Sequence, residues 1–439
     1  LGLAGAGLGA AAAAAPVFHD LDELISSAPP GLHHPWWTKE VDEPTVEVDW
    51  AIMANGFDLT HSPSHGKHKE EWALYLGNGD YEKGEALRQK HNADKSARRI
   101  QYREQKLMGH RVQDLAVKSG QGAGGSWRHS KGKCGFLGPQ TASTPESLGL
   151  AKWSGTPEEN SRMVTAALKH WGAPTVGLID LEPGTTRNFI YRYEAGDPKG
   201  KEKAYTWENV DKGYETDTKR VLPDKCRWGF TWTFYQSHMA GEAGLSSDRY
   251  NMGRHQHYKV QEMIRALGYS AYGPYSYPNN FGSAGAFGVM GGLGEIGRNI
   301  VLTSPILAGS HGMGAKLATD LPLAPGKPVD FGMRPFCRTC MICAEQCPGD
   351  AISLDTEPTW EVNGSWDQAG IKTWRYLAGK CFPFMDMQPC NASGPAGCQK
   401  WCPFYSDDRA MLHEVVRATV ATTSIFNGFF TNMESTFGY

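Results

Sequence analysis

The most constraining feature of this 439-residue sequence is a run of four closely spaced cysteines in its last third. The run reads Cys337-Arg-Thr-Cys340-Met-Ile-Cys343-Ala-Glu-Gln-Cys347-Pro348, which is the pattern C-x2-C-x2-C-x3-C-P. In this pattern, three thiolates from a short loop bind one [4Fe–4S] cluster and the fourth binds a neighbouring cluster. The sequence therefore predicts that this part of the chain folds around iron–sulfur clusters.

A second cysteine group supplies the remaining ligands that two clusters need. Its closing stretch, Cys398-Gln-Lys-Trp-Cys402-Pro403, repeats the C-x3-C-P ending. Cross-ligation then predicts one cluster bound by Cys337, Cys340, Cys343 and Cys402, and another bound by Cys347, Cys381, Cys390 and Cys398. Structural zinc and disulfides are the alternatives, although disulfide scaffolds are usually short chains whose cysteines are spread through loops. Cys134 and Cys226 stand apart, and we expect them to be dispensable for iron binding.

Composition limits the partners of the chain. The 44 Lys and Arg residues against 47 Asp and Glu residues give a net charge of −3. This balance lacks the basic surplus of a general nucleic-acid binder, so no nucleic-acid partner is expected. The two cysteine groups occupy roughly 70 residues, and since a domain usually takes ~100–200 residues, the larger remainder is expected to hold whatever the electrons reduce.

The N-terminal segment 1–16 reads LGLAGAGLGAAAAAAP. This apolar run is shorter than the about 20 residues that a membrane-spanning helix needs. It is typical of the apolar region and Ala-rich cleavage site of an export signal, and we interpret it as the remnant of one. A buried helix rich in Ala, Gly and Leu is the alternative.

Between these ends the sequence predicts an N-terminal unit over residues 17–150 and an α/β region over residues 151–330. The N-terminal unit is polar and contains one strongly charged helical stretch at about Asp80–Val117. In the α/β region, Thr156 is expected to cap a helix that has Pro157 at its first position and Glu159 three residues after the cap. Further expected elements are strands at Val176–Leu181, Trp228–Tyr235 and Ile300–Leu307, a helix at Tyr258–Leu267 and a polar insertion at about 183–224.

Several blocks of the α/β region resemble a known family when taken in order. They are Ser154–Met163, Tyr250, Val260–Tyr269, Gly292–Arg298 and Thr319–Leu323, followed by the cysteine run and a closing Phe437-Gly-Tyr439. From about residue 150 onward the chain resembles the catalytic subunit of corrinoid-dependent respiratory reductive dehalogenases. The resemblance implies an α+β protein with a nitroreductase-like α/β core that binds a cobamide. It also implies a bacterial-ferredoxin-like domain with two [4Fe–4S] clusters over residues 331–408 and a segment 409–439 that packs on the core.

The resemblance also implies the activity and its setting. We expect cleavage of carbon–halogen bonds in small chlorinated alkanes or alkenes, as the terminal step of organohalide respiration. Electrons would pass through both clusters to a base-off cobamide. The expected partners are a small membrane-anchor subunit and an upstream quinone-linked or other electron donor. A homodimer is the candidate assembly of the catalytic subunit. Because the cofactors must be inserted before export, we expect the twin-arginine route and a peripheral location on the outer face of the cytoplasmic membrane.

For the chemistry itself, the resemblance implies a tyrosine that donates the proton. Tyr250 occupies the matching place, with Tyr258 and Tyr275 as rivals, and Asn280 is the expected polar partner that orients the halogen. The family has an Arg before the Thr-Asp-Leu-Pro block that tunes this tyrosine, but no Arg occurs between Ser304 and Lys316. Lys316 is the expected replacement and His311 the alternative, although each could equally be a surface residue.

Ser304 and Leu307 in the same stretch are expected to contact the cobamide. The aromatic residues Trp37, Tyr275, Phe281 and Trp374 are candidates for an apolar pocket. No D-x-H-x-x-G motif occurs, so no histidine is singled out as a cobalt ligand.

Gly292-Leu-Gly294-Glu-Ile-Gly297 matches the pattern G-x-G-x-x-G, which is also found in dinucleotide-binding folds. Such a site needs a preceding strand, a following helix and a suitably placed acidic residue. We instead expect these glycines to let the chain pass close beside a macrocycle. An enzyme resembling epoxyqueuosine reductase and an electron carrier without a corrinoid are the alternative functions.

Overall fold

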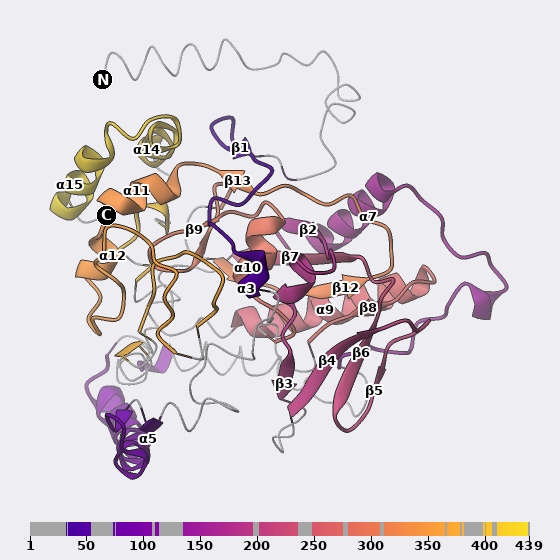
Figure 1. The fold of residues 1–439 in the computed structure, drawn as a ribbon, viewed down its shortest axis with the longest axis horizontal. Coiled ribbons are helices and arrows are strands. Elements are labelled where there is room, and N and C mark those ends of the chain that lie inside the picture. Colours follow the sequence, from indigo (N-terminus) through magenta and orange to yellow (C-terminus); the bar gives the residue numbers. More distant parts are fainter. Residues whose placement is uncertain are drawn as a thin grey trace.

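The structure of this protein, a computed structural model, is shown in Figure 1. It describes residues 32, 34–53, 73–74, 76–107, 110–113, 135–195, 202–235, 248–274, 280–307, 311–364, 367–377, 380–381, 398–399, 401–405 and 411–437. The expected export-signal remnant therefore lies outside the described residues, as do Cys134, Tyr275 and Cys390. Among the helices described, none is long and apolar enough to cross a lipid bilayer.

A five-stranded antiparallel sheet forms the centre of the α/β region. Its longest strand, β7 (Trp228–Tyr235), pairs through residues 228–232 with β2 (Val176–Asp180) on one side. On its other side β7 pairs with two shorter strands, β11 (His311–Met313) and β12 (Leu317–Thr319), and β8 (Ala271–Tyr272) extends the sheet beyond β12. The sheet is thus built around one aromatic strand.

Helices cover both faces of this sheet. Side chains alternate across a strand, so Val176 and Leu178 of β2 point to one face and Ile179 to the other. The first face packs against α7 (Pro157–His170) and α9 (Asp248–Ala266), and the second against α10 (Ala284–Met290). The α/β character expected of residues 151–330 is therefore confirmed.

Local signals account well for the start of α7. The backbone N–H of Glu159 donates to the hydroxyl of Thr156 at 3.2 Å, and the Glu159 carboxylate accepts from the Thr156 N–H at 2.8 Å. This is a complete capping box with Pro157 at the first helical position, as predicted. The predicted strands at Val176–Leu181 and Trp228–Tyr235 are also confirmed, whereas α9 begins ten residues before the predicted Tyr258.

The predicted strand at Ile300–Leu307 is wrong. Only Leu302–Thr303 (β10) is paired, with Glu295–Ile296 (β9). Pro305 has no N–H to give to a ladder, and the hydroxyl of Ser304 accepts hydrogen bonds from the N–H groups of Ile306 and Leu307 at 3.2 Å each. The chain therefore turns immediately after β10.

The predicted insertion contains a separate sheet of four strands in the order β3-β4-β6-β5. The strands β4 (Glu202–Glu208) and β6 (Lys219–Pro223) are parallel, and Tyr205 and Leu222 pack into the same hydrophobic cluster as α10. The remaining elements of this insertion are a short helix η3 (Thr186–Phe189), β3 (Tyr193–Ala195) and β5 (Tyr214–Glu215).

The cysteine region follows β13 (Val329–Asp330) in the sequence. Because β13 pairs with β1 (Lys39–Glu40), the start of the N-terminal unit lies beside the cysteine region. Its first thiols lie in and around α11 (Met333–Thr339) and α12 (Ile342–Glu345). The C-terminal helices α14 (Met411–Thr422) and α15 (Asn427–Phe437) pack against α11 (Figure 1). Within residues 411–437, Val420 joins the hydrophobic cluster that includes Phe336 of the cysteine region. The packing of segment 409–439 on the core stays a prediction.

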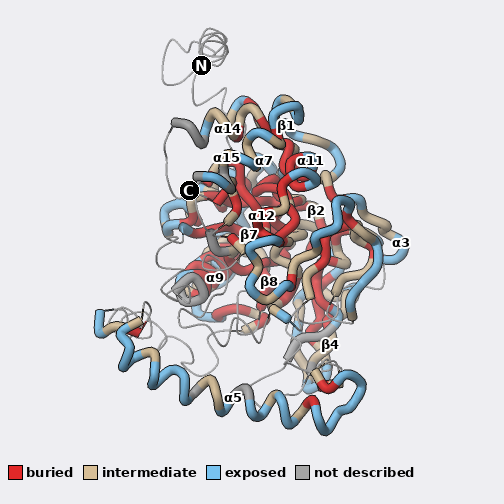
Figure 2. The backbone as a smooth tube through the Cα atoms, turned by 90° about the vertical axis from the view of Figure 1, so that its left-hand side faces the viewer, coloured by how far each residue is buried: buried red, intermediate tan, exposed pale blue. Residues whose placement is uncertain are grey.

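The charged helix expected near Asp80–Val117 is α5 (Tyr81–Glu104), which Asp80 caps by accepting from the Lys83 N–H at 3.0 Å. Figure 2 shows it as a largely exposed rod at the edge of the molecule. The other short helices are α3 (Trp50–Met53), η2 (Glu146–Leu148) and η4 (Pro403–Tyr405).

Candidate functional site

The structure brings together four thiols that the sequence places in one ligand set. Cys337, Cys340, Cys343 and Cys402 are all buried and line one small cavity, which Arg298 and Phe404 help to enclose. Burial raises the pKa of the Cys343 thiol well above its usual value, and the proximity of Cys402 and Cys337 raises it further. Cys402 is 59 residues from Cys343 in the sequence, so the tertiary fold has to bring them together.

The second set is described in part. Cys347, Cys381 and Cys398 are half-buried free thiols, and Cys390 lies outside the described residues. Burial raises the pKa of Cys398 to about 12, and the proximity of Cys381 and then Cys347 adds to this shift. Three thiols of the second predicted set are thus neighbours. In the described part of the chain, no three His, Cys, Asp or Glu side chains converge tightly enough to hold a single metal ion.

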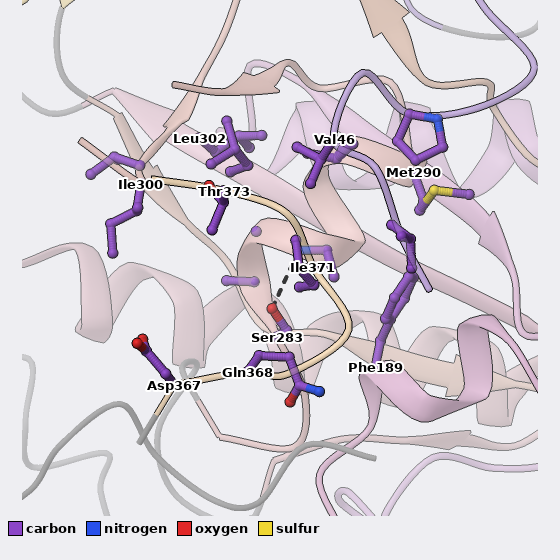
Figure 3. Close-up of a pocket in the computed structure, with 18 of the residues that line it drawn as sticks. Val46, Phe189, Ser283, Met290, Ile300, Leu302, Asp367, Gln368, Ile371 and Thr373 are labelled. Carbon is purple, nitrogen blue, oxygen red and sulfur yellow. Dashed lines mark hydrogen bonds between the residues drawn. The ribbon is translucent and has the colours of Figure 1, made fainter. Parts of the chain in front are cut away.

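A larger cavity of about 490 Å³ lies between the core and the cysteine region. Figure 3 shows its labelled side chains coming from the N-terminal unit, the core and the segment 367–373. The lining is mostly apolar, and a few polar side chains interrupt it, which is typical of sites for small molecules and cofactors. The apolar members include Val46, Trp50, Phe189, Met290, Leu302, Ile371 and Trp374, and the polar ones Ser283, Asp367, Gln368, Thr373, Arg375, Tyr376 and Gln399.

One segment separates this apolar cavity from the thiol cavity. Ile296, Ile300 and Leu302 line the apolar cavity, whereas Arg298 and Asn299 line the thiol cavity. Gly297 lies between them, and a Cβ atom there would come within 3.1 Å of the Cys337 sulfur. The wall between the two cavities is therefore a single stretch of backbone whose side chains face both ways.

This segment contains the G-x-G-x-x-G pattern, and its structure differs from a dinucleotide site. The pattern follows α10 and contains the short strand β9, whereas a dinucleotide-binding loop follows a strand and opens a helix. Gly292 has a positive φ of 75°, and a Cβ there would lie 2.6 Å from the Lys327 carbonyl oxygen. The last glycine, Gly297, allows close approach to a cysteine thiol.

Residues close to the second thiol set also line the apolar cavity. Tyr376 and Gln399 line the cavity, and Gln399 directly follows Cys398. Burial raises the pKa of Tyr376, and the nearby Cys381 thiol raises it further. Asp367 lies in the same wall, where burial raises the pKa of its carboxyl group. Residues next to each group of thiols therefore line one apolar cavity.

The residues expected to carry the proton chemistry lie in the core. Tyr250 is in the first turn of α9, although its side chain lies outside the description. The rival Tyr258 stacks on His257 with ring centroids 5.1 Å apart. Asn280 is half-buried just before the turn that leads to α10. Neither Tyr258 nor Asn280 is among the described residues that line the apolar cavity.

Lys316 is completely buried, so the alternative of a surface lysine is wrong. Burial is the larger cause that lowers the pKa of His257, to about 3, and the Lys316 ammonium is the second. The side chain of the other alternative, His311, lies outside the description. Lys316 thus places a positive charge inside the core, close to α9.

Ser304 and Leu307 are also buried, in the turn after β10. They are not among the described residues that line the apolar cavity, so their contact with a cofactor stays a prediction. Of the four aromatic candidates, Trp374 does line the cavity. Trp37 packs against Phe331, Phe281 packs in the core beside Tyr205, and Tyr275 lies outside the description.

Sequence analysis missed several buried charged residues near these sites, among them Arg254, Glu295 and Arg298. A signal for Arg254 was its spacing of three residues from His257, which puts both on one side of α9. Glu295 and Arg298 flank Gly297 in a block that the family resemblance had already singled out. The roles of Glu295 and Arg298 depend on the atoms that their side chains contact in the folded protein. The spacing of residues in the sequence does not indicate these contacts.

Comparison with known proteins decides the family. Residues 33–323 match the family model described as reductive dehalogenase subunit, which is more than half of the chain. The chain belongs to this family. It is the catalytic subunit of a reductive dehalogenase, an enzyme of the oxidoreductase class.

Two relatives and one solved structure illustrate the similarity. The dehalogenase is 31% identical to a chloroethene reductive dehalogenase of Dehalococcoides mccartyi (strain VS), over all of this chain and 92% of the relative. It is 28% identical to a trichloroethene reductive dehalogenase of the same species (strain ATCC BAA-2266 / KCTC 15142 / 195), again over 100% and 92%.

The solved catabolic reductive dehalogenase NpRdhA matches 94% of this chain with a TM-score of 0.60 at 19% identity. The dehalogenase spans 51% of that chain, so this likeness shows the fold alone.

Proposed function

We propose that this dehalogenase removes halogen from small chlorinated alkanes or alkenes, chloroethenes among them, using a cobamide and two [4Fe–4S] clusters. The observation that carries the proposal is the apolar cavity, whose lining includes residues next to both groups of thiols: Ile296 and Ile300 flank the segment against the first set, and Gln399 directly follows Cys398. Two of its relatives are chloroethene and trichloroethene reductive dehalogenases, and another solved relative is described as suggesting a mechanism for B12-dependent dehalogenation. These likenesses support the substrate class and the corrinoid.

The thiol sets fit iron–sulfur clusters on chemical grounds. All four thiols of the first set are buried, and burial raises the pKa values of Cys337, Cys343 and Cys402. Such thiols do not ionise readily beside one another, and bound iron would supply the positive charge that stabilises them as thiolates. Cys337, Cys340, Cys343 and Cys402 would hold one cluster. Cys347, Cys381 and Cys398, with Cys390, would hold the other. On this reading the region is a bacterial-ferredoxin-like domain.

The side chains that line the apolar cavity suit a corrinoid. Its aliphatic and aromatic side chains suit the faces of a macrocycle, and Ser283, Gln368, Thr373 and Gln399 could exchange hydrogen bonds with the amide groups at the rim of a corrin. When bound, the cobamide would supply a strongly reducing cobalt that cleaves the carbon–halogen bond. The core around the cavity would then be nitroreductase-like, with helices on both faces of its sheet.

The chain's own residues would handle the proton and exclude water. Tyr250 would donate the proton, and Asn280 would orient the halogen. Lys316 would favour the ionised form of the tyrosine, because a nearby cation lowers the pKa of an acid. The apolar lining would keep water away from the reducing centre.

The cellular setting follows the same proposal. The enzyme would be exported by the twin-arginine route and held by a small anchor subunit at the outer face of the cytoplasmic membrane. There it would accept electrons from a quinone-linked or other donor, as the last step of organohalide respiration, with a homodimer as the assembly considered. The apolar, Ala-rich segment 1–16 supports the export step.

Purification under anaerobic conditions after cobamide-replete expression tests this proposal. We expect about one cobalt and about eight iron atoms per chain, together with release of chloride from chlorinated ethenes when a strong one-electron reductant is supplied. A brown, cobalt-free protein without this activity would refute the corrinoid part and favour an electron carrier.

A cavity variant tests the location of the corrinoid. Gly285 lines the apolar cavity, and a Cβ atom there would meet only the Cδ1 of Ile296, at 3.4 Å. Gly285→Phe should therefore fill the cavity, abolish cobalt binding and leave the iron content unchanged. Gly428→Phe is the matched control on α15, because a Cβ there meets nothing within 4 Å. Normal cobalt in Gly285→Phe would place the corrinoid elsewhere.

A further inference from the structure

The guanidinium group of Arg298 is buried against the first thiol set. Only 1% of this residue is exposed, and it is among the largest fully buried side chains described. Its Nε donates to the carbonyl oxygens of Cys337 and Cys340 at 3.1 and 3.2 Å, and one Nη donates to the Cys337 carbonyl at 2.7 Å. The other Nη donates to the carbonyls of Ser353 and Asp355, both at 2.7 Å. The cation thus ties two ligand-bearing residues to a neighbouring loop.

The charge of Arg298 has no paired carboxylate in the described part of the chain, where its hydrogen bonds go to backbone carbonyls and the flat face of Trp374 lies 4.8 Å away. A buried charge is costly unless an opposite charge compensates it. The thiolates of the first set would supply this opposite charge, because Arg298 contacts Cys337 and Cys340 directly.

The backbone at Arg298 also meets the same ligand. Its N–H lies 3.5 Å from the Cys337 sulfur and donates to it. Hydrogen bonds to cluster sulfurs and the net charge near a cluster are two of the properties that set its reduction potential. Arg298 supplies both, and it does so from the wall that separates the thiol cavity from the apolar cavity.

We propose that Arg298 is the buried counter-ion of the cluster held by Cys337, Cys340, Cys343 and Cys402, and that it selectively raises the reduction potential of this cluster. The inference rests on the proposed function. One electron from an external donor converts the [4Fe–4S]²⁺ core to [4Fe–4S]⁺, and no bond forms or breaks. Because reduction adds one negative charge beside a fixed cation, Arg298 favours the reduced state. It acts through the cluster, so it is a positioning and tuning residue.

The test is a potentiometric titration followed by EPR on anaerobic, cofactor-loaded enzyme. The two cluster signals are first distinguished with Cys402→Ser and Cys398→Ser. Arg298→Met should lower the equilibrium constant for reducing the first cluster by about tenfold or more, which corresponds to about 59 mV for a one-electron couple. The second cluster should be unchanged. Arg298→Lys, which keeps the charge, should stay within about threefold of the wild type.

Arg220→Met is the matched control. Arg220 is also fully buried, but it lies in the sheet β3-β4-β6-β5 and pairs with Glu215 at 3.4 Å. Arg220→Met should change the reduction potential of neither cluster. An unshifted first cluster in Arg298→Met, or an equal shift of both clusters, would overturn the inference. If Arg298→Met does not retain the first cluster, the test depends on Arg298→Lys. A tenfold fall in the equilibrium constant for reducing the first cluster in Arg298→Lys would also overturn the inference. Wild-type protein without iron would instead overturn the proposed function.

Discussion

Lys316 and His257 lie within electrostatic reach of each other inside the core, and both are almost completely buried. Burial and then the Lys316 charge lower the pKa of His257 to about 3, from its usual 6.5. His257 is therefore neutral at physiological pH. Because the unfolded chain binds the proton more readily, this residue favours folding above pH 6.5, and its contribution is lost as the pH falls from about 6.5 towards 3.

Replacing Lys316 by Met should raise the pKa of His257 but leave it below 6.5, since burial is the larger cause. Histidine NMR titration of the folded protein measures this. Lys259→Met is the control, because Lys259 is exposed on the same helix. In the loaded enzyme, Lys316→Met should also move the pH optimum upward if this cation tunes the proton donor. An unchanged His257 titration would show that the ammonium does not act on the imidazole.

Tyr250→Phe tests proton donation separately from electron delivery. The change removes one hydroxyl and little volume, so iron and cobalt contents should match the wild type. Turnover should fall by about 10²–10⁴-fold, which is the usual contribution of a positioned general acid. Tyr258→Phe is the control, because that ring stacks on His257. Full activity in Tyr250→Phe would transfer the role to Tyr258 or Tyr275, and loss of cobalt would make Tyr250 a structural wall.

Cys402→Ser tests the division of the thiols into two sets. Cys402 lines one cavity with Cys337, Cys340 and Cys343, so its loss should damage that cluster and spare the other. Iron analysis and EPR measure the loss. Cys398→Ser should give the opposite pattern, and Cys226→Ser should change neither, because Cys226 is buried in the core cluster of the α/β region. If Cys402→Ser removed the signal that Cys398→Ser also removes, cross-ligation would be wrong.

Glu295 should make stability depend on pH near neutrality. It is completely buried, and burial raises the pKa of its carboxyl group to about 7 although Thr45 and the Phe331 N–H donate to it. The folded state then holds a proton between about pH 4.5 and 7 that the unfolded chain has released. Stability therefore falls as the pH rises through this window, by up to about 3 kcal/mol.

Glu295→Gln removes this titration. Relative to the wild type, the variant should gain stability as the pH rises from 5 to 8, and chemical unfolding at both pH values measures the difference. Glu262→Gln serves as the control, because that carboxylate is less buried and accepts from the N–H groups of Thr141 and Ala142. Parallel pH profiles for wild type and Glu295→Gln would show that Glu295 stays ionised.

Sequence reasoning succeeded where the physical cause is local. Thr156, Pro157 and Glu159 satisfy the first N–H groups of α7 from within one turn, so their spacing predicts the helix start. The spacing of Cys337, Cys340 and Cys343 similarly predicts that these thiols gather at one site, and they line one cavity, although they lie in and around two short helices rather than in a single loop. It failed at Ile300–Leu307, where an apolar run suggests a strand but Ser304 and Pro305 end the pairing after two residues.

By itself, the sequence determined the family and the start of α7, because each depends on residues that are neighbours along the chain. Only the tertiary structure decided which charges are buried and what they meet. Lys316 could equally have been a surface lysine, and the fold encloses it beside His257. Arg298 follows a glycine pattern that suggests a nucleotide loop. Its guanidinium instead donates hydrogen bonds to backbone carbonyls of Cys337 and Asp355. These partners are 39 and 57 residues away in the sequence, so only the tertiary fold brings them to Arg298.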